Sequence, residues 1–331
     1  MKIVVMGSGA IGSLYGGLLN LVNPGSVTLV ARSPHVDAIR ANGLIIKGVM
    51  GNHTVPIHAV ENASEIDSAD VILITTKTYD TENAAQKIRH LMETGAYVVI
   101  IQNGIGTETV VSEILNSDKV LRATTCMGAL ITAPGEVTIT GNGITEVGSH
   151  YPENQSLVEE ITDLMAAAGL NVRASDNIEG VVWTKTIVNC GINPVGALTG
   201  MTNGQVYGNE ILRQLVIRLV DETARVADAL GITLTTDNPV RYTLGTAKAT
   251  SANINSMLQD LLAHKQTEVD FITGAVIKFA RELGIETPIS ESVYALIKAI
   301  ESRYLDKPLK KDEMIVSVDE LFKAIIPETS S

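Results

Sequence analysis

The sequence is poor in aromatic residues and in cysteine. Phe, Trp and Tyr together make up 4% of the 331 residues, and the two cysteines are Cys126 and Cys190. The core must therefore consist mainly of Val, Ile, Leu and Ala, a composition that suits buried parallel strands between helices. Two cysteines provide no disulfide framework, and neither they nor the six histidines show the spacing of metal ligands. We expect a cytoplasmic protein without a metal site.

Basic residues are in the minority, and long apolar runs are missing. Lys and Arg number 25 against 37 Asp and Glu, which gives a formal net charge of −12. General binding to nucleic acid or to anionic membranes requires a clustered basic surface, which this balance argues against. No apolar run approaches the roughly 18 residues needed to cross a bilayer. The expected partner is a small molecule, and the oligomeric state stays open, with a homodimer among the alternatives.

Strand and helix patterns alternate along the first part of the chain, which indicates βαβ units and a parallel sheet. The predicted strands cover 2–6, 26–31, 71–75 and 97–101, and the predicted helices cover about 10–22, 34–42, 79–92 and 107–115. A small hairpin is predicted at 44–60. After residue 120 the pattern changes to β-like runs separated by Gly- and Pro-containing turns, which predict antiparallel strands. These runs cover 124–132, 135–140 and 143–148, and a helix at 153–168 and a short strand at 170–174 follow.

Strand patterns end after residue 176. Helical periodicities then cover 179–188, 209–230, 259–283 and 291–302. We therefore predict an α/β domain at 1–175, followed by an all-α domain at 176–331.

A glycine motif follows the first predicted strand and opens the first helix. In Gly7-x-Gly9-x-x-Gly12, the first glycine permits a tight turn, the second lets the backbone approach a pyrophosphate, and the third allows close packing of helix on strand. The helix N-terminus presents free N–H groups to an anion. A turn that needs only a flexible backbone is the alternative. We predict a dinucleotide site, and the cofactor-binding residues are Gly7, Ser8, Gly9, Ala10, Ile11 and Gly12.

The end of the second strand indicates which dinucleotide binds. An NAD site places Asp or Glu about 20 residues beyond the glycines, but here the strand ends in Val30-Ala31-Arg32-Ser33. Arg32 offers a planar cation to a 2′-phosphate. A solvated arginine is the alternative. We predict NADP(H) as the cofactor, with Arg32 as a contact.

Two polar residues follow the third and fourth predicted strands. Lys77 comes after strand 71–75 and Asn103 after strand 97–101. The carboxyl edge of an open α/β sheet is where ligands bind. We predict that both residues belong to the site, although each could be an ordinary loop residue.

Polar side chains in the second half recur at intervals of four. Lys185, Asn189 and Asn193 share one face of a predicted helix among apolar neighbours, which favours a ligand-lining face over a solvated one. Ser256, Asp260, His264 and Glu268 repeat in the same way, although an exposed helix face looks similar. Twelve residues of straight helix span about 18 Å, so Ser256 and Glu268 can hold one small acid only if the helix begins after Ser256 and the chain turns there.

These features together resemble the ketopantoate reductases (2-dehydropantoate 2-reductases). The resemblance covers about residues 1–300 and rests on the glycine motif, Lys77, Gln102-Asn103-Gly104, the Lys185/Asn189/Asn193 series, Asn203-Gly204 and Ser256-Met-Leu-Gln-Asp260 followed by Glu268. It implies a Rossmann-type dinucleotide-binding domain followed by an all-α C-terminal domain. It also implies NADPH-dependent reduction of ketopantoate to pantoate, a step towards pantothenate and coenzyme A.

The resemblance also implies roles for single residues. Lys185 would be the general acid, and Glu268 would bind the substrate hydroxyl. The implied substrate-positioning residues are Asn103, Asn189, Asn193, Asn203 and Ser256. Chemistry agrees, because hydride addition to a ketone builds negative charge on oxygen, and a lysine can stabilise this charge and deliver a proton.

Two other functions stay open. One is a related reductase of another 2-keto acid or an opine-type dehydrogenase. The other is a regulator that binds NADP without turnover.

Overall fold

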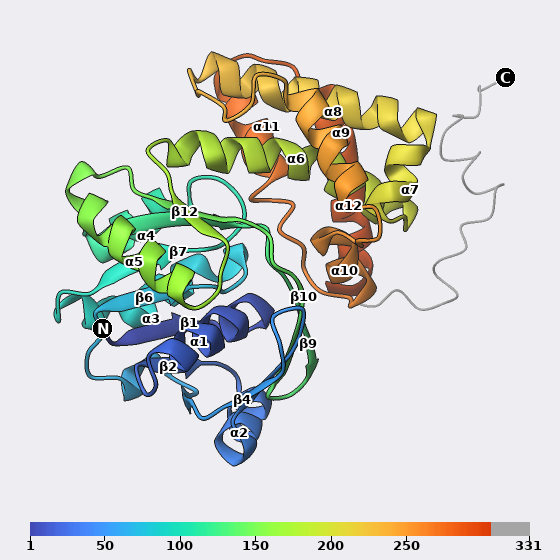
Figure 1. The fold of residues 1–331 in the computed structure, drawn as a ribbon. Helices are drawn as coiled ribbons and strands as arrows, with labels where there is room; N and C mark the ends of the chain where they lie inside the picture. Colours follow the sequence, from blue (N-terminus) through green and yellow to red (C-terminus); the bar gives the residue numbers. More distant parts are fainter. Residues whose placement is uncertain (306–331) are drawn as a thin grey trace, which may run out of the picture.

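The computed structural model describes residues 1–305 and contains an α/β half followed by a helical half (Figure 1). The predicted fold class is confirmed. The main sheet has eight strands in the order β12-β11-β8-β7-β6-β1-β2-β5. Their bounds are Ile3–Met6 (β1), Val27–Val30 (β2), His58–Val60 (β5), Val71–Ile74 (β6), Tyr97–Ile100 (β7), Val120–Thr125 (β8), Thr145–Gly148 (β11) and Val172–Ala174 (β12).

Six neighbouring strands, β8, β7, β6, β1, β2 and β5, run parallel to one another. Strand β11 is antiparallel to β8, and β12 is parallel to β11. Alternate strand residues face opposite layers: Ile3 and Val5 pack into one core with helix α1 and helix α5, while Val4 and Met6 pack into a second core with α3 and α4. These helices are Ala10–Val22 (α1), Thr81–Met92 (α3), Thr107–Leu115 (α4) and Gln155–Ala167 (α5). Helices on both faces explain the continuous apolar strands.

A second sheet of four strands, in the order β4-β3-β10-β9, covers the outer side of α1. Its strands are Leu44–Gly48 (β3), His53–Val55 (β4), Gly128–Ala133 (β9) and Glu136–Gly141 (β10), and helix α2 covers Ser33–Asn42. Two adjacent glycines let α1 fit between the sheets. A Cβ on Gly16 would collide with Leu29 of the main sheet, and one on Gly17 would lie 2.6 Å from Ile46 of the second sheet. Close packing on both sides thus explains part of the glycine content.

The predicted strand at 124–132 is wrong in its bounds. It straddles the end of β8 and the beginning of β9, and these two strands belong to different sheets. Strand β8 pairs in parallel with β7 on one side and is antiparallel to β11 on the other, so the antiparallel part of the main sheet begins at β8. The sequence shows an uninterrupted β-like run here because the chain stays extended while it passes from one sheet to the other.

The helical half begins with the long helix α6, which packs against several helices around it (Figure 1). Its helices are Ile178–Thr199 (α6), Asn203–Gly208 (α7), Glu210–Ala229 (α8), Pro239–Ala249 (α9), Ser256–Leu262 (α10), Thr273–Glu282 (α11) and Pro288–Leu305 (α12). Helix α6 runs well past the predicted end at residue 188 and through Pro194. Among residues 1–305 no helix has the length and apolarity needed to cross a membrane.

The predicted helix at 259–283 is wrong, because it is two helices joined by a non-helical segment. Helix α10 ends at Leu262, and His264 adopts φ +50°. The amides of His264 and Lys265 donate to the carbonyls of Leu261 and Asp260, a C-terminal cap with a left-handed residue. Residues 263–272 then lead to α11. Ser256 and Glu268 therefore do not share a straight helix, and the chain turns after α10 and not at Ser256.

Candidate active site

The carboxyl ends of four parallel strands gather the predicted residues of the α/β half. Gly7 follows β1, Arg32 follows β2, Lys77 lies three residues after β6, and Asn103 lies three residues after β7. Strands β2, β1, β6 and β7 are neighbours in the sheet, so these residues share one edge. This edge is where open α/β sheets bind their ligands.

The glycine motif forms a tight cradle at this edge. Gly7 has φ +102°, and a Cβ there would lie 2.7 Å from the backbone nitrogen of Thr76. A Cβ on Gly12 would lie 2.6 Å from the carbonyl oxygen of Gly7. A Cβ on Gly9 would meet nothing within 4 Å among the described residues, so the backbone is open on that side. The hydroxyl of Ser8 is buried and has no hydrogen-bond partner within residues 1–305. A dinucleotide phosphate fits this cradle at the N-terminus of α1.

Arg32 is exposed at the N-cap position of α2. The neighbouring Ser33 hydroxyl donates to Asp37 at 2.8 Å. Arg32 is thus available to a phosphate group beyond the end of β2.

Lys185 lies where the two halves of the molecule meet. Its ammonium group donates to Asn103 Oδ1 at 2.9 Å and to the carbonyl oxygen of Thr125 at 2.7 Å. An ammonium group has three donors, so one N–H of Lys185 remains for a ligand. Helix α6 supplies Lys185, whereas β7 and β8 position its two acceptors.

Glu268 lies on the other side of the Asn103 side chain. Its carboxylate accepts from Asn103 Nδ2 at 3.0 Å, from the Thr78 amide at 3.1 Å and from the Thr78 hydroxyl at 2.8 Å. The amide of Asn103 therefore joins Lys185 to Glu268, with its oxygen towards the cation and its nitrogen towards the anion. Only one orientation of this amide satisfies both partners.

Lys77 forms a second link between the halves. Its ammonium group lies 2.6 Å from Asp260 Oδ2 and 3.7 Å from Glu268 Oε2. The backbone of Lys77 and its neighbour Thr76 is held by Gln102, whose Nε2 donates to both of their carbonyls. Lys77 thus faces the carboxylates of the helical half.

The surroundings lower the pKa of both Lys185 and Glu268, which favours the neutral form of the lysine and the charged form of the glutamate. Burial lowers the pKa of Lys185, and the charge of Arg122 lowers it further. Burial would raise the pKa of Glu268, but the charge of Lys77 and the hydrogen bonds from Asn103 and Thr78 bring it below its ordinary value. The site therefore holds an anionic carboxylate beside a lysine that releases its proton more readily than usual.

The remaining predicted residues lie apart from this cluster of contacts. Asn189 and Asn193 follow Lys185 on α6, one and two turns further on, and Asn193 is buried. Asn203 donates to the Thr250 hydroxyl at 2.9 Å and so ties α7 to the end of α9. Ser256 is exposed in the first turn of α10, a helix that packs on α6.

Several residues of the site have no clear signal in the sequence. Thr78 contacts Glu268 partly through its backbone amide, and Thr125 contacts Lys185 through a carbonyl, so side-chain type reveals neither. Arg122 is 1% exposed, and its guanidinium donates to the carbonyls of Ile100 and Gly104, on either side of Asn103. Arg122 lies just before the predicted strand at 124–132, and the sequence around it does not indicate this role.

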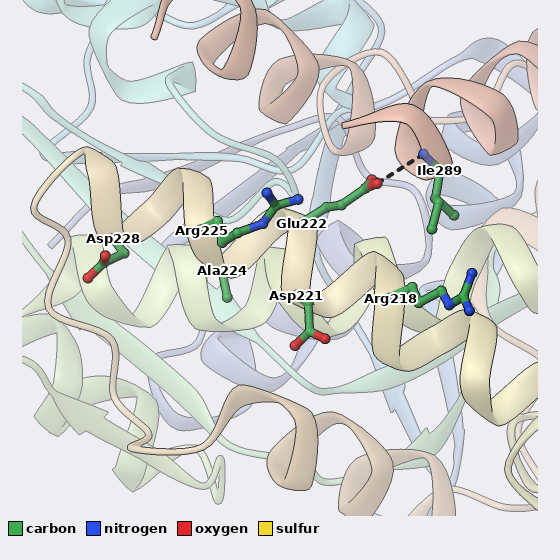
Figure 2. Close-up of a pocket in the computed structure, with 7 residues that line it drawn as sticks. All are labelled: Arg218, Asp221, Glu222, Ala224, Arg225, Asp228 and Ile289. Atoms are coloured by element: carbon green, nitrogen blue, oxygen red, sulfur yellow. Dashed lines mark hydrogen bonds between the residues drawn. The ribbon is translucent and has the colours of Figure 1, made fainter. Parts of the chain in front are cut away.

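A surface groove on α8 does not belong to this site (Figure 2). It has a volume of about 650 Å³ and is lined by Arg218, Asp221, Glu222, Ala224, Arg225, Asp228 and Ile289. None of these residues contacts Lys185, Asn103 or Glu268 through a hydrogen bond or ion pair.

A dinucleotide cradle on a parallel sheet, joined to a half-buried lysine and a buried carboxylate from a helical half, defines an NAD(P)-binding oxidoreductase. Family models described as "Ketopantoate reductase PanE/ApbA" and "Ketopantoate reductase PanE/ApbA C terminal" match residues 3–152 and 177–301. The chain belongs to the ketopantoate reductase family.

Individual relatives agree with this assignment but differ in substrate. A 2-dehydropantoate 2-reductase of Pyrococcus abyssi is 37% identical over 91% of this chain and 98% of its own. The crystal structure of a PanE/ApbA family ketopantoate reductase from Ralstonia eutropha matches with a TM-score of 0.85 and 30% identity, covering 92% of this chain and 99% of that one. A D-mandelate dehydrogenase with NADH and anilino(oxo)acetate matches with the same TM-score, 26% identity and the same coverage.

Proposed function

We propose that this protein is an NADPH-dependent 2-dehydropantoate 2-reductase, which reduces ketopantoate to pantoate in pantothenate and coenzyme A biosynthesis. The observation that carries the proposal is the Lys185–Asn103–Glu268 arrangement, with one lysine N–H unused. The names of the relatives at 29–37% identity support the substrate. The reaction takes place in the cytoplasm in this proposal.

Lys185 acts as the general acid. NADPH, held by the 7–12 cradle and Arg32, would supply the hydride. The free N–H of Lys185 is placed to stabilise the negative charge that develops on the keto oxygen. The lowered pKa of Lys185 makes transfer of its proton to that oxygen easier. Asn103 and the Thr125 carbonyl fix the direction of the ammonium group.

Glu268 binds the hydroxyl group of the substrate. Its Oε1 accepts both bonds from Thr78, whereas Oε2 accepts one bond from Asn103 and so retains acceptor capacity. A ketopantoate hydroxyl can donate there. We assign Asn189, Asn193, Asn203 and Ser256 to positioning the rest of the substrate.

The cofactor in this proposal is NADPH, bound by the 7–12 cradle, Arg32, Lys77 and Asn103. Two observations support the choice of NADPH over NADH: Arg32 is exposed beyond β2, and no acidic residue stands at the end of that strand. A phosphate on the ribose would meet the Arg32 guanidinium.

A reductase of another 2-keto acid is the second candidate. The D-mandelate dehydrogenase with a TM-score of 0.85 favours it, because that enzyme shares the fold and acts on an aromatic hydroxy acid. The aromatic keto acid of that reaction, phenylglyoxylate, has no hydroxyl group for Glu268 to bind, whereas ketopantoate has one. The two candidates therefore differ in what they require of Glu268.

Steady-state NADPH oxidation with ketopantoate, phenylglyoxylate, pyruvate and 2-ketoisovalerate separates the candidates. We expect the highest kcat/KM with ketopantoate, and a loss of at least tenfold with that substrate alone in Glu268→Gln. A preference for any of the other three acids would refute the proposed substrate.

The same assay tests whether the protein is a non-catalytic NADP-binding regulator. Lys185→Met should lower kcat by about 100-fold or more and leave the Kd of NADPH within twofold, because the lysine supplies the proton but is not needed for cofactor affinity. Absence of turnover with all four acids in the unchanged protein would favour the regulator.

A further inference from the structure

Glu268 lies in a stretch of chain with no helix or strand of its own. Residues 263–272 join α10 to α11. A carboxylate in such a segment has no helical ladder to hold its backbone, yet Glu268 is 6% exposed and makes three hydrogen bonds. Something other than local secondary structure must fix its place.

One face of helix α12 holds the residues on both sides of Glu268. The carboxylate of Glu301 accepts from the Thr267 amide at 2.6 Å. The hydroxyl of Tyr294 donates to Asp270 at 2.7 Å, and Lys298 donates to the same carboxylate at 2.9 Å. Positions 294, 298 and 301 share one helix face because they are spaced four and three apart. We call Tyr294, Lys298 and Glu301 the α12 clamp.

Burial of the Glu301 carboxylate costs desolvation free energy that an apolar side chain in the same place would not. Glu301 is 1% exposed, and its charge is balanced by Lys298 at 2.9 Å. A buried ion pair gives little net stability compared with apolar side chains of similar size. An apolar residue, however, cannot accept the hydrogen bond of the Thr267 amide. The carboxylate therefore serves to fix the backbone immediately before Glu268.

The clamp itself rests on a fixed helix. The buried carboxylate of Glu222 on α8 accepts from the amide of Ile289 at 3.0 Å (Figure 2). It also accepts from the amide and the hydroxyl of Ser290, at 2.8 and 2.7 Å. These bonds cap the first turn of α12. Helix α12 thus has a defined position relative to α8 before it contacts the 267–270 segment.

We propose that Tyr294, Lys298 and Glu301 are positioning residues that hold Glu268 in place to bind the substrate. They act through Thr267 and Asp270, and none of the three forms a hydrogen bond or ion pair with Lys185, Asn103 or Glu268 within residues 1–305. This inference rests on the proposed role of Glu268, and it deepens that role by naming what fixes it.

A double-mutant cycle tests whether the clamp acts through Glu268. Glu301→Met preserves size but removes the acceptor, and it should lower kcat/KM for the keto acid about tenfold, mainly through KM. In the Glu268→Gln background the same change should add less than twofold, because the group to be positioned is already gone. The Kd of NADPH should stay within twofold in both backgrounds.

Two further variants complete this experiment. Glu301→Gln keeps an acceptor for the Thr267 amide and should recover most of the activity. Tyr294→Phe removes a single hydroxyl and should raise KM even if Glu301→Met fails to fold. The matched control is Glu291→Gln, a change on helix α12 that breaks an exposed ion pair with Arg281 of α11 and should leave KM and kcat unchanged. Equal losses in the two backgrounds, or an unchanged KM in folded clamp variants, would overturn the proposal.

Amide hydrogen exchange provides a readout that does not depend on turnover. The Thr267 amide should exchange at least tenfold faster in Glu301→Met than in the unchanged protein, and Glu291→Gln should leave it unaffected. If no keto acid is reduced, the proposed function is wrong. The exchange rate of the Thr267 amide then still tests whether the α12 clamp holds this segment. An unchanged rate at Thr267 in Glu301→Met would refute it.

Discussion

Exchange of the Asn103 amide for a carboxylate probes the centre of the site with almost no change in shape. In Asn103→Asp, one oxygen still accepts from Lys185, but the other replaces the Nδ2 that donates to Glu268 at 3.0 Å. Two carboxylate oxygens then face each other, and the pair can share a proton only when the pH is low enough.

The distance sets the size of the effect. Two unit charges 3.0 Å apart repel by about 5 kcal/mol at an effective dielectric constant of about 20. Lys77 and Lys185 offset part of this repulsion, which leaves a cost on the order of 3 kcal/mol, or roughly 100-fold in kcat/KM. The loss applies at alkaline pH. As the pH falls, a proton on the pair restores a donor between the two groups, and activity should recover.

The assay is kcat/KM for the keto acid between pH 5.5 and 8.5, relative to the unchanged protein at each pH. We expect the ratio to rise at least tenfold from pH 8.5 to pH 5.5 in Asn103→Asp. Asn103→Ala is the control, because it removes the amide without adding charge, and its deficit should be independent of pH. A ratio for Asn103→Asp that does not vary with pH would refute the reasoning about the Lys185–Asn103–Glu268 arrangement.

Other predictions concern the cofactor, the protonation of the lysine and the buried arginine. Arg32→Ala should raise the Kd of NADPH at least tenfold and leave that of NADH unchanged in fluorescence titrations; equal effects would exclude a 2′-phosphate contact. Burial lowers the pKa of Lys185, and only the protonated lysine can act as the acid. As the pH rises, kcat for reduction should therefore decline at a pH below the pKa of an ordinary lysine, and this decline should be absent in Lys185→Arg. Although burial acts to raise the pKa of Glu108, His150 and Arg122 lower it from 4.5 to about 2. Glu108→Gln should therefore reduce the free energy of unfolding by about 3 kcal/mol at pH 7, and the deficit should shrink below pH 4.5 in urea titrations; a deficit that persists unchanged at pH 3 would count against the ion pair.

Local sequence predicts those parts of the site whose chemistry lies in side chains at the ends of strands. The glycine motif, Lys77 and Asn103 follow apolar strands, and parallel pairing brings the ends of these strands together. Lys185 stands out for a similar reason, since a lysine among apolar residues on a helix is unusual. In each case one residue and its immediate neighbours suffice for the prediction.

Contacts from distant parts of the chain decide what the sequence does not reveal. The repeat of polar residues from Ser256 to Glu268 matches a helix, but the left-handed His264 and the bond from Thr267 to Glu301 break it. Backbone groups such as the Thr125 carbonyl carry no signature at all. The predicted helix at 179–188 is shorter than α6, which continues through Pro194 to Thr199. Pro194 removes only one backbone hydrogen bond, and packing against several other helices stabilises α6 beyond it.

The bonds from Lys185 to Asn103 and Thr125, and from Lys77 to Asp260, all join the α/β half to the helical half. Neither half alone contains both the acid and the groups that orient it. A fragment that contains only one half should therefore have none of the proposed activity, even if it folds. A substitution at one end of these bonds must be compatible with the residue at the other end. Changes in the two halves are therefore coupled, and the halves cannot be exchanged independently between relatives.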